Sequence, residues 1–164
     1  MPSGTTADGL ELVSSLTNLQ TLDVHGYKIE TGYAPLRKLN NLKVLGLGTY
    51  RTSDAELAHL GCLNNLQALL IGNTGISNAG LEHLRALNNL QSLDICYTNV
   101  DLNGVKNLLL QHPNLRRLWV SPYDRDDNLL WLDRPGLTNY HAVQRSWLSQ
   151  GGLIGNIYNR TILD

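Results

Sequence analysis

Four side chains in this sequence are of types that carry out chemistry in enzymes, and their spacing decides whether they can. Cys96 and His25 could form a nucleophile and its general base. Asp23 and Asp94 could form the two carboxylates of a glycoside-cleaving site. Each pair is widely separated along the chain, so the elements that carry its members must be identified first.

A leucine pattern, Leu-x-x-Leu-x-aliphatic, occurs five times and fixes the elements. It opens at Leu19, Leu42, Leu66, Leu90 and Leu115, with spacings of 23, 24, 24 and 25 residues. A near-constant period of this length predicts a solenoid of strand-plus-helix units. Each strand is followed by a crossover of more than a dozen residues, so the strands must lie side by side as a parallel sheet.

The crossovers and turns show further periodic columns. Apolar side chains at helical spacing are Leu10/Val13/Leu16, Tyr33/Leu36/Leu39, Leu57/Leu60/Leu63 and Leu81/Leu84/Leu87. The column before the first strand leucine is Asn18, Asn41, Asn65, Asn89 and Asn114, and the column at the helix starts is Gly9, Gly32, Gly80 and Gly104. We interpret the asparagines as binding nearby peptide groups and the glycines as allowing close packing. Pro35 should fall in the first turn of its helix, and Ser53-Asp-Ala-Glu56 predicts a capping box.

This spacing separates the candidate catalytic pairs. Neighbouring strands lie about 4.8 Å apart, so residues three units apart in one column are separated by about 14 Å. Cys96 and His25 are such a pair, and proton transfer between them would require about 3 Å. Asp23 and Asp94 are also three units apart, beyond the roughly 5–9.5 Å of a glycosidase pair.

A metal site is disfavoured as well. His59 and His83 occupy the same helical column in adjacent units, but packed helices lie about 8–10 Å apart and no Cys or carboxylate completes a ligand set. The sequence therefore predicts no catalytic residues, no metal, no cofactor and no enzymatic activity. The alternative is chemistry in the last forty residues, where Asp133 and His141 lie without a nucleophile in a recognisable context.

Composition excludes several classes of function. The chain has 164 residues, 42% of them hydrophobic and 16% charged, and a net charge of −1. This charge argues against a nucleic-acid partner, and no apolar run approaches the ~20 residues that span a membrane. The first residues lack the features of a secretory signal, and two cysteines do not make a disulfide framework, so we expect a cytoplasmic protein.

The two ends of the repeat region differ. The chain opens inside a repeat, with a helix but no strand, so we expect this edge to be covered by a second copy or a partner, or to continue a longer protein. At the other end the leucine period stops, and Tyr140, Val143 and Trp147 predict an amphipathic helix. We therefore divide the chain into a solenoid over residues 1–125 and a C-terminal cap over residues 126–164.

The segments Leu66-Gln-Ala-Leu69-Leu-Ile71-Gly-Asn-Thr74-Gly-Ile76 and Leu90-Gln-Ser-Leu93-Asp-Ile95-Cys-Tyr-Thr98-Asn-Val100 resemble the leucine-rich repeat. The resemblance covers roughly residues 3 to 123. The sequence resembles in particular the repeats with a helical convex side, which are common in bacterial proteins, and the related cysteine-containing and ribonuclease-inhibitor-like subclasses. It implies an α/β fold, a right-handed solenoid with a parallel sheet on the concave face and helices on the convex face. It also implies a non-enzymatic module for protein–protein interaction.

The concave face is therefore the predicted site for a protein or peptide partner. The candidate residues are Thr21, Asp23, His25, Val44, Leu70, Asp94, Cys96, Tyr97, Arg117 and Trp119. Leu70, Tyr97 and Trp119 are predicted anchors, with Leu70 facing outward, and Gly46, Gly48 and Gly72 would leave room for the partner. An alternative for Trp119 is packing under the cap. The alternative function is recognition within a larger assembly, such as a ubiquitin-ligase adaptor, a bacterial effector or an immune sensor.

Overall fold

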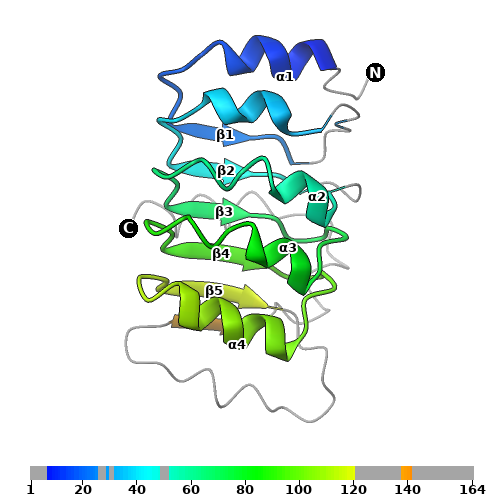
Figure 1. Cartoon of the computed structure of the whole chain (residues 1–164), viewed down its shortest axis with the longest axis vertical. Coiled ribbons are helices and arrows are strands. Elements are labelled where there is room, and N and C mark those ends of the chain that lie inside the picture. The colour runs from blue at the N-terminus through cyan, green and yellow to red at the C-terminus, as the bar shows by residue number, and fades with distance from the viewer. Residues whose placement is uncertain (1–6, 26–28, 30–31, 49–51, 121–137, 142–164) are drawn as a thin grey trace, which may run out of the picture.

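A computed structural model of the chain shows a stack of strand-plus-helix units (Figure 1). The structure describes residues 7–25, 29, 32–48, 52–120 and 138–141. The strands are β1 (Thr21–Asp23), β2 (Val44–Gly46), β3 (Ala68–Leu70), β4 (Ser92–Ile95), β5 (Arg117–Val120) and β6 (Thr138–His141). The helices are α1 (Ala7–Ser14), the 3₁₀ helix η1 (Ala34–Lys38), α2 (Asp54–Leu57), α3 (Asn78–Glu82) and α4 (Leu102–Gln111).

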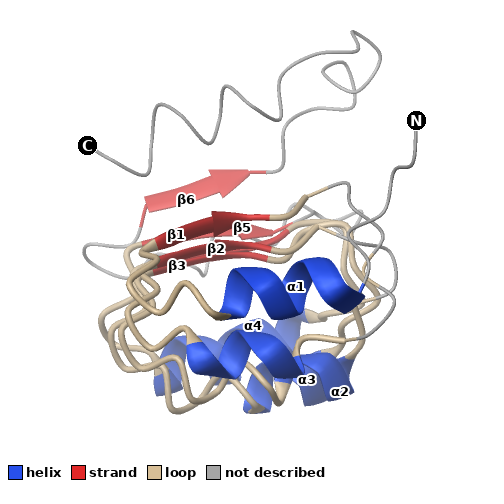
Figure 2. Cartoon of the chain, turned by 90° about the horizontal axis from the view of Figure 1, so that it is seen from above, coloured by secondary structure: helices blue, strands red, loops and turns tan. Residues whose placement is uncertain are grey.

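The strands form one parallel sheet in chain order, β1 to β6, of which β1 to β5 were predicted from the crossover lengths. Seen from above, the strands form one layer and the helices a second layer on one side of it (Figure 2). In the first five strands the inward leucines pair in register, from Leu22 with Leu45 to Leu93 with Leu118. A side chain at a given position of one unit therefore lies beside its counterpart in the next.

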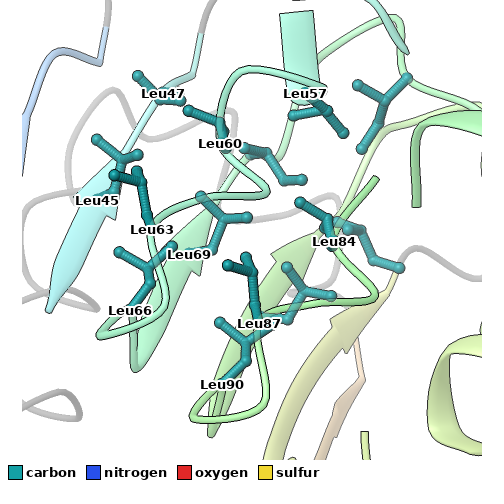
Figure 3. Packing of buried hydrophobic residues seen from close by; sticks show 14 of the residues in the cluster. Leu45, Leu47, Leu57, Leu60, Leu63, Leu66, Leu69, Leu84, Leu87 and Leu90 are labelled. Atoms are coloured by element: carbon teal, nitrogen blue, oxygen red, sulfur yellow. The ribbon is translucent and has the colours of Figure 1, made fainter. Parts of the chain in front are cut away.

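The core is a column of aliphatic side chains between these two layers (Figure 3). Leu45 and Leu69 enter it from the strands, and Leu60 and Leu84 from the crossovers, all fully buried. Stacking identical side chains in this way removes apolar area from water at every unit boundary, worth about 25 cal/mol per Å².

The helices lie where the leucine spacing predicts them, but they are short. In the second crossover, α2 ends at Leu57, and Leu60 and Leu63 follow in turns closed by i to i+3 bonds from Leu60 N to Leu57 O and from Leu63 N to Leu60 O. A 3₁₀ turn advances further per residue than an α turn, so it returns the chain to the next strand in few residues. Pro35 lies in the first turn of η1, as predicted.

The predicted capping box at Ser53 is wrong. Ser53 is the N-cap residue of α2, but its side chain makes no capping hydrogen bond. The Glu56 carboxylate instead accepts a hydrogen bond from the Tyr33 backbone N–H in the preceding unit, at 2.7 Å. A contact between units thus replaces the local contact within one helix.

The asparagine and glycine columns are structural, as interpreted from the sequence. Asn41, Asn65, Asn89 and Asn114 each donate from Nδ2 to a backbone carbonyl of the preceding unit, at 2.8 to 3.1 Å. A Cβ added to Gly80 would lie 2.3 Å from Asp54 Oδ1, and one added to Gly104 would lie 2.0 Å from Asn78 Oδ1. Glycine fits at these two helix starts without displacing the polar side chain of the preceding unit, which occupies the space a Cβ would take.

The C-terminal prediction is wrong at Tyr140, which lies in strand β6 and not in a helix. β6 pairs with β5 in parallel and thereby extends the repeat sheet. Val143 and Trp147, and the rest of the predicted cap apart from β6, lie outside the described residues. Among the helices that the structure describes, none is both long enough and apolar enough to span a membrane.

Candidate functional site

The outward positions of the strands form two rows across the concave face, in the register predicted from the repeat. One row is Thr21, Val44, Ala68, Ser92 and Arg117, and the other is Asp23, Gly46, Leu70, Asp94 and Trp119. Each row places acidic or neutral side chains on β1 and a basic or aromatic side chain on β5. The face therefore changes in chemical character from one end to the other.

At the β1 end, Asp23 and His25 form a pair. The Asp23 carboxylate lies 2.6 Å from His25 Nδ1 and also accepts a hydrogen bond from the His25 backbone N–H at 2.9 Å. The Asp23 side chain is 54% exposed and the His25 side chain only 19%. Asp23 is therefore the more accessible side chain of the two.

The glycines beside this pair do not leave room for a partner, and that prediction is wrong. A Cβ on Gly48 would lie 2.0 Å from His25 Cδ2, and a Cβ on Gly46 would lie 2.6 Å from His25 Nδ1. On the other side, a Cβ on Gly72 would lie 3.0 Å from Asp94 Oδ1. The side chains of His25 and Asp94 lean across the neighbouring strands and fill the space above the glycines.

Leu70 lies in an outward position, as predicted, but the expectation that it is exposed is wrong. Its side chain is 6% exposed, and Ala68 and Ser92 in the same part of the face are buried as well. Leu70 lies in register between Gly46 and Asp94, where side chains of flanking strands lean over the glycines. The centre of the concave face is thus enclosed, and a partner cannot use Leu70 as a first contact.

Asp94 and Cys96 form a second pair near the centre of the sheet. The Asp94 carboxylate accepts a hydrogen bond from the Cys96 backbone N–H at 2.9 Å. Burial raises the pKa of Asp94 above its ordinary value of 3.8, although the bonds from Cys96 and the charge of His25 act in the opposite direction. His25 influences Asp94 because the two side chains lean toward each other from opposite sides, an effect that spacing along the column did not reveal.

The described residues hold no cluster of three or more His, Cys, Asp or Glu side chains that could bind a metal ion. Cys62 and Cys96 are both free thiols. His83 is exposed on the convex side, and His59 is half-buried in the adjacent unit.

Tyr97 is the residue whose role the sequence understated. Its φ is +56°, and Asn73 has φ +60° at the equivalent position one unit earlier. Asparagine tolerates this left-handed backbone, whereas a bulky side chain is strained there. Tyr97 is also 41% exposed at the end of β4. Tyr97 was predicted as an anchor from its residue type, but its left-handed backbone, which Asn73 shares one unit earlier, was not predicted.

The remaining predicted residues line the β4–β5 side and the two rows. Thr21 is exposed, and Val44, Arg117 and Trp119 are half-buried. Trp119 lies in register with Asp94, and Arg117 with Ser92. The structure thus brings Tyr97, Arg117 and Trp119 to one side of the face and Asp23 and His25 to the other.

Comparison with solved structures gives the class of protein. Internalin C2 from Listeria monocytogenes matches with a TM-score of 0.57 and 27% sequence identity, covering 80% of this chain and 55% of that one. A leucine-rich repeat protein of Leptospira interrogans matches with a TM-score of 0.53 and 23% identity, covering 64% of this chain and 26% of that one. The actin-binding site 2 of leiomodin-1 matches with a TM-score of 0.52 and 15% identity, covering 73% of this chain and 80% of that one.

These matches confirm the fold that the resemblance implied: the chain has the α/β solenoid fold of leucine-rich repeat proteins. It spans about a quarter of the length of the Leptospira protein and about half of internalin C2. No family model matches the chain. No curated protein matches it either.

Proposed function

We propose that this chain is a non-enzymatic module that binds a protein or peptide through the concave side of its sheet. The fold supports protein binding in general, because leiomodin-1 uses a segment of the same fold as an actin-binding site. The two free thiols are compatible with the reducing, cytoplasmic setting that we propose for it. A polypeptide partner is favoured over a nucleic acid, since a net charge of −1 gives the chain no overall excess of positive charge.

The observation that carries the proposal is the strained and exposed Tyr97. A non-glycine residue in the left-handed region costs of order 1–3 kcal/mol, and such strain concentrates at functional sites. Asn73 shows that the repeat can fill this position without strain. A tyrosine kept at 41% exposure in a costly conformation is explained by contacts made with a partner, since tyrosine is a preferred anchor of interfaces.

The neighbouring side chains set the chemistry of the partner. Arg117 and Trp119 on β5 favour an acidic or aromatic group, and Asp23 on β1 favours a basic group. The enclosed centre around Leu70 divides these two ends. We therefore expect an extended segment that contacts the β4–β5 side through Tyr97 and carries a positive charge toward β1.

The test is to replace Tyr97 by asparagine, which suits the left-handed backbone. Relief of strain should offset the lost ring contacts, so the variant should fold with a stability within about 1 kcal/mol of the wild type. Leu102→Asn on α4 is the matched control, because Leu102 is a large apolar residue of similar exposure, 37%, on the convex side. Partners captured from lysate by the wild type are identified, purified and titrated against all three proteins by calorimetry.

We expect Tyr97→Asn to weaken the dissociation constant at least tenfold, which is about 1.4 kcal/mol. Leu102→Asn should change it less than twofold. Equal affinity of the wild type and Tyr97→Asn would refute the role of Tyr97. A loss confined to Leu102→Asn would move the binding surface to the convex helices.

A further inference from the structure

A single asparagine of the sequence precedes a glycine, namely Asn103 before Gly104. In such a pair the backbone nitrogen of the second residue can attack the side-chain amide carbon of the asparagine. A side chain on the second residue hinders this attack, and glycine has none. The asparagines of the structural column all precede leucine, so the same attack is hindered at those positions.

The packing of α4 explains why a glycine follows Asn103. A Cβ on Gly104 would lie 2.0 Å from Asn78 Oδ1, so the contact with the preceding unit favours glycine at this position. Asn103 itself is exposed at the second position of α4, so its side-chain amide is accessible to water. The repeat thus places the reactive pair in the first turn of a helix.

The Asp101 carboxylate holds the backbone of this pair in the helical conformation. Asp101 is the N-cap residue of α4, and its Oδ1 accepts a hydrogen bond from Gly104 N at 3.0 Å. This bond contributes most to the lowered pKa of Asp101, and the bonds from Asn78 and from the Asn103 backbone N–H add to it. Asn78 on α3 fixes Asp101 in turn, because its Nδ2 donates to Asp101 Oδ1 at 2.8 Å and its Oδ1 accepts from Asp101 N at 3.0 Å.

These contacts oppose the attack in two ways. The helical backbone keeps Asn103 Cγ away from Gly104 N, so the first turn of α4 must open before the two atoms can meet. The attack also requires the Gly104 nitrogen to lose its proton, and the negative carboxylate beside it disfavours the resulting amide anion. Asp101 therefore limits how often the reactive geometry arises.

We propose that Asn103 is a site of spontaneous deamidation that is gated by opening of the first turn of α4, with Asp101 keeping that turn closed. In the open state a bond forms between Gly104 N and Asn103 Cγ, and the Cγ–Nδ2 bond breaks. Ammonia leaves with the proton that the Gly104 nitrogen has lost. Water then opens the cyclic imide at either carbonyl, which gives aspartate or isoaspartate. The site lies on α4, away from the concave sheet, so the proposal stands without the proposed function.

The two products should affect α4 differently. Aspartate places a second carboxylate in the first turn, where the helix dipole favours negative charge. Isoaspartate adds a methylene to the main chain before Gly104, which moves Gly104 N out of register with the Asp101 carboxylate. Val105 and Leu108 carry the buried face of α4 directly after this point. Isoaspartate should therefore weaken the packing of α4 on α3.

Incubation of the purified full chain at mildly alkaline pH tests the proposal. Tandem mass spectrometry of the peptide that contains Asn103 follows the two products, and the same chain held unfolded in urea gives the rate without structure. Asp101→Ala removes the cap, and Asp101→Asn keeps an acceptor without the charge. Asn41→Ala is the matched control, because it loses a hydrogen bond to Thr17 O at the other end of the stack.

We expect Asn103 in the folded wild type to react roughly tenfold or more slowly than in urea, because only the open turn reacts. Loss of an N-cap side chain raises the population of the open turn about fivefold, so Asp101→Ala should react about fivefold faster than the wild type. The rate in Asp101→Asn should lie between these two rates. Asn41→Ala should react at the wild-type rate.

Circular dichroism must first show that each variant is folded. Equal rates in Asp101→Ala and the wild type would overturn the proposal, and so would a wild-type rate equal to that in urea. An increase in Asn41→Ala as large as that in Asp101→Ala would also overturn it, because the whole stack would then have to unfold before reaction. The isoaspartate form, separated by ion exchange, should unfold at lower urea than the aspartate form, and the reverse order would contradict the role of the first turn.

Discussion

Replacing Asp54 by alanine should destabilise the solenoid at the boundary between its second and third crossovers. Asp54 Oδ1 accepts a hydrogen bond from the Ser77 backbone N–H at 2.7 Å, and Oδ2 accepts one from Ser77 Oγ at 2.6 Å. Hydrogen bonds to a charged group contribute about 1.5–3 kcal/mol each. Both residues are half-buried, so we take the lower end and expect a loss of about 3 kcal/mol.

Two variants separate the contributions to this loss. Asp54→Asn keeps an acceptor for the Ser77 N–H but loses the charge, so it should cost only about 1 kcal/mol. Ser77→Ala removes the hydroxyl, which also accepts a long capping bond from Ala79 N at 3.3 Å. In a double-mutant cycle, Asp54→Ala and Ser77→Ala should couple by about 1.5 kcal/mol, the contribution taken above for the bond between Ser77 Oγ and Asp54 Oδ2.

Gly80 provides a sharper test of the same geometry. A Cβ there would lie 2.3 Å from Asp54 Oδ1 and 3.2 Å from Leu57 Cδ1. Gly80→Ala should therefore cost about 1–3 kcal/mol in the wild type, because the added methyl overpacks the contact. In the Asp54→Ala background the main clash is gone, and the helix propensity of alanine, about 1 kcal/mol above that of glycine, should make the change neutral or favourable.

Urea unfolding followed by circular dichroism measures these free energies, with an unchanged m-value as the condition for comparing them. The reasoning fails if Asp54→Ala costs less than 1 kcal/mol. It also fails if Gly80→Ala costs the same in both backgrounds, because the steric conflict with Asp54 would then be absent.

Two acidic residues should give opposite pH dependence of stability. Burial raises the pKa of Asp94 above 3.8, so its contribution to the free energy of unfolding is fully present below the unfolded pKa and is lost as pH rises through the folded pKa. Asp94→Asn keeps an acceptor for Cys96 N, so this variant should be more stable than the wild type at pH 7 and equal to it at pH 3.5. Equal stability at both pH values would contradict the burial effect. The hydrogen bonds from Gly104 N and Asn78 lower the pKa of Asp101 below 3.8. The contribution of Asp101 to the free energy of unfolding is therefore present above the unfolded pKa and is lost as pH falls through the folded pKa. Asp101→Asn should therefore lose less stability than the wild type between pH 5 and pH 2, and parallel urea midpoints over that range would contradict the assignment.

The repeat made the fold predictable because each of its features recurs at a fixed spacing. The alternation of inward and outward residues follows from the strand period of two, so the rows through Asp23 and Thr21 were placed correctly in register. The structural role of the asparagines also followed, because their side chain suits backbone bonds next to a turn. Such features follow from the residues of one unit and from their recurrence in the other units, and both can be read from a single sequence.

The concave surface was less predictable because it depends on how each side chain leans toward its neighbours. His25 and Asp94 lie over glycines of adjacent strands, which closes space that the glycines alone would leave open. The local pattern around Glu56 predicts a helix cap, but its carboxylate reaches across the unit boundary and accepts a hydrogen bond from Tyr33 N in the preceding unit. Side-chain direction across units is set by tertiary packing, and a local pattern does not carry it.

The hydrogen bonds of the asparagines explain how the stack tolerates units of unequal length. The donors and acceptors of Asn41, Asn65, Asn89 and Asn114 are separated by 24, 25, 25 and 26 residues. Each value is one more than the spacing of the preceding leucines, 23, 24, 24 and 25, so every asparagine reaches the residue before its own counterpart. The start of each strand is thereby held at a constant position, and an extra residue must be accommodated in the crossover. The sheet can keep its register while the convex side varies, which is why the outward residues of the concave face can be placed by counting along the repeat.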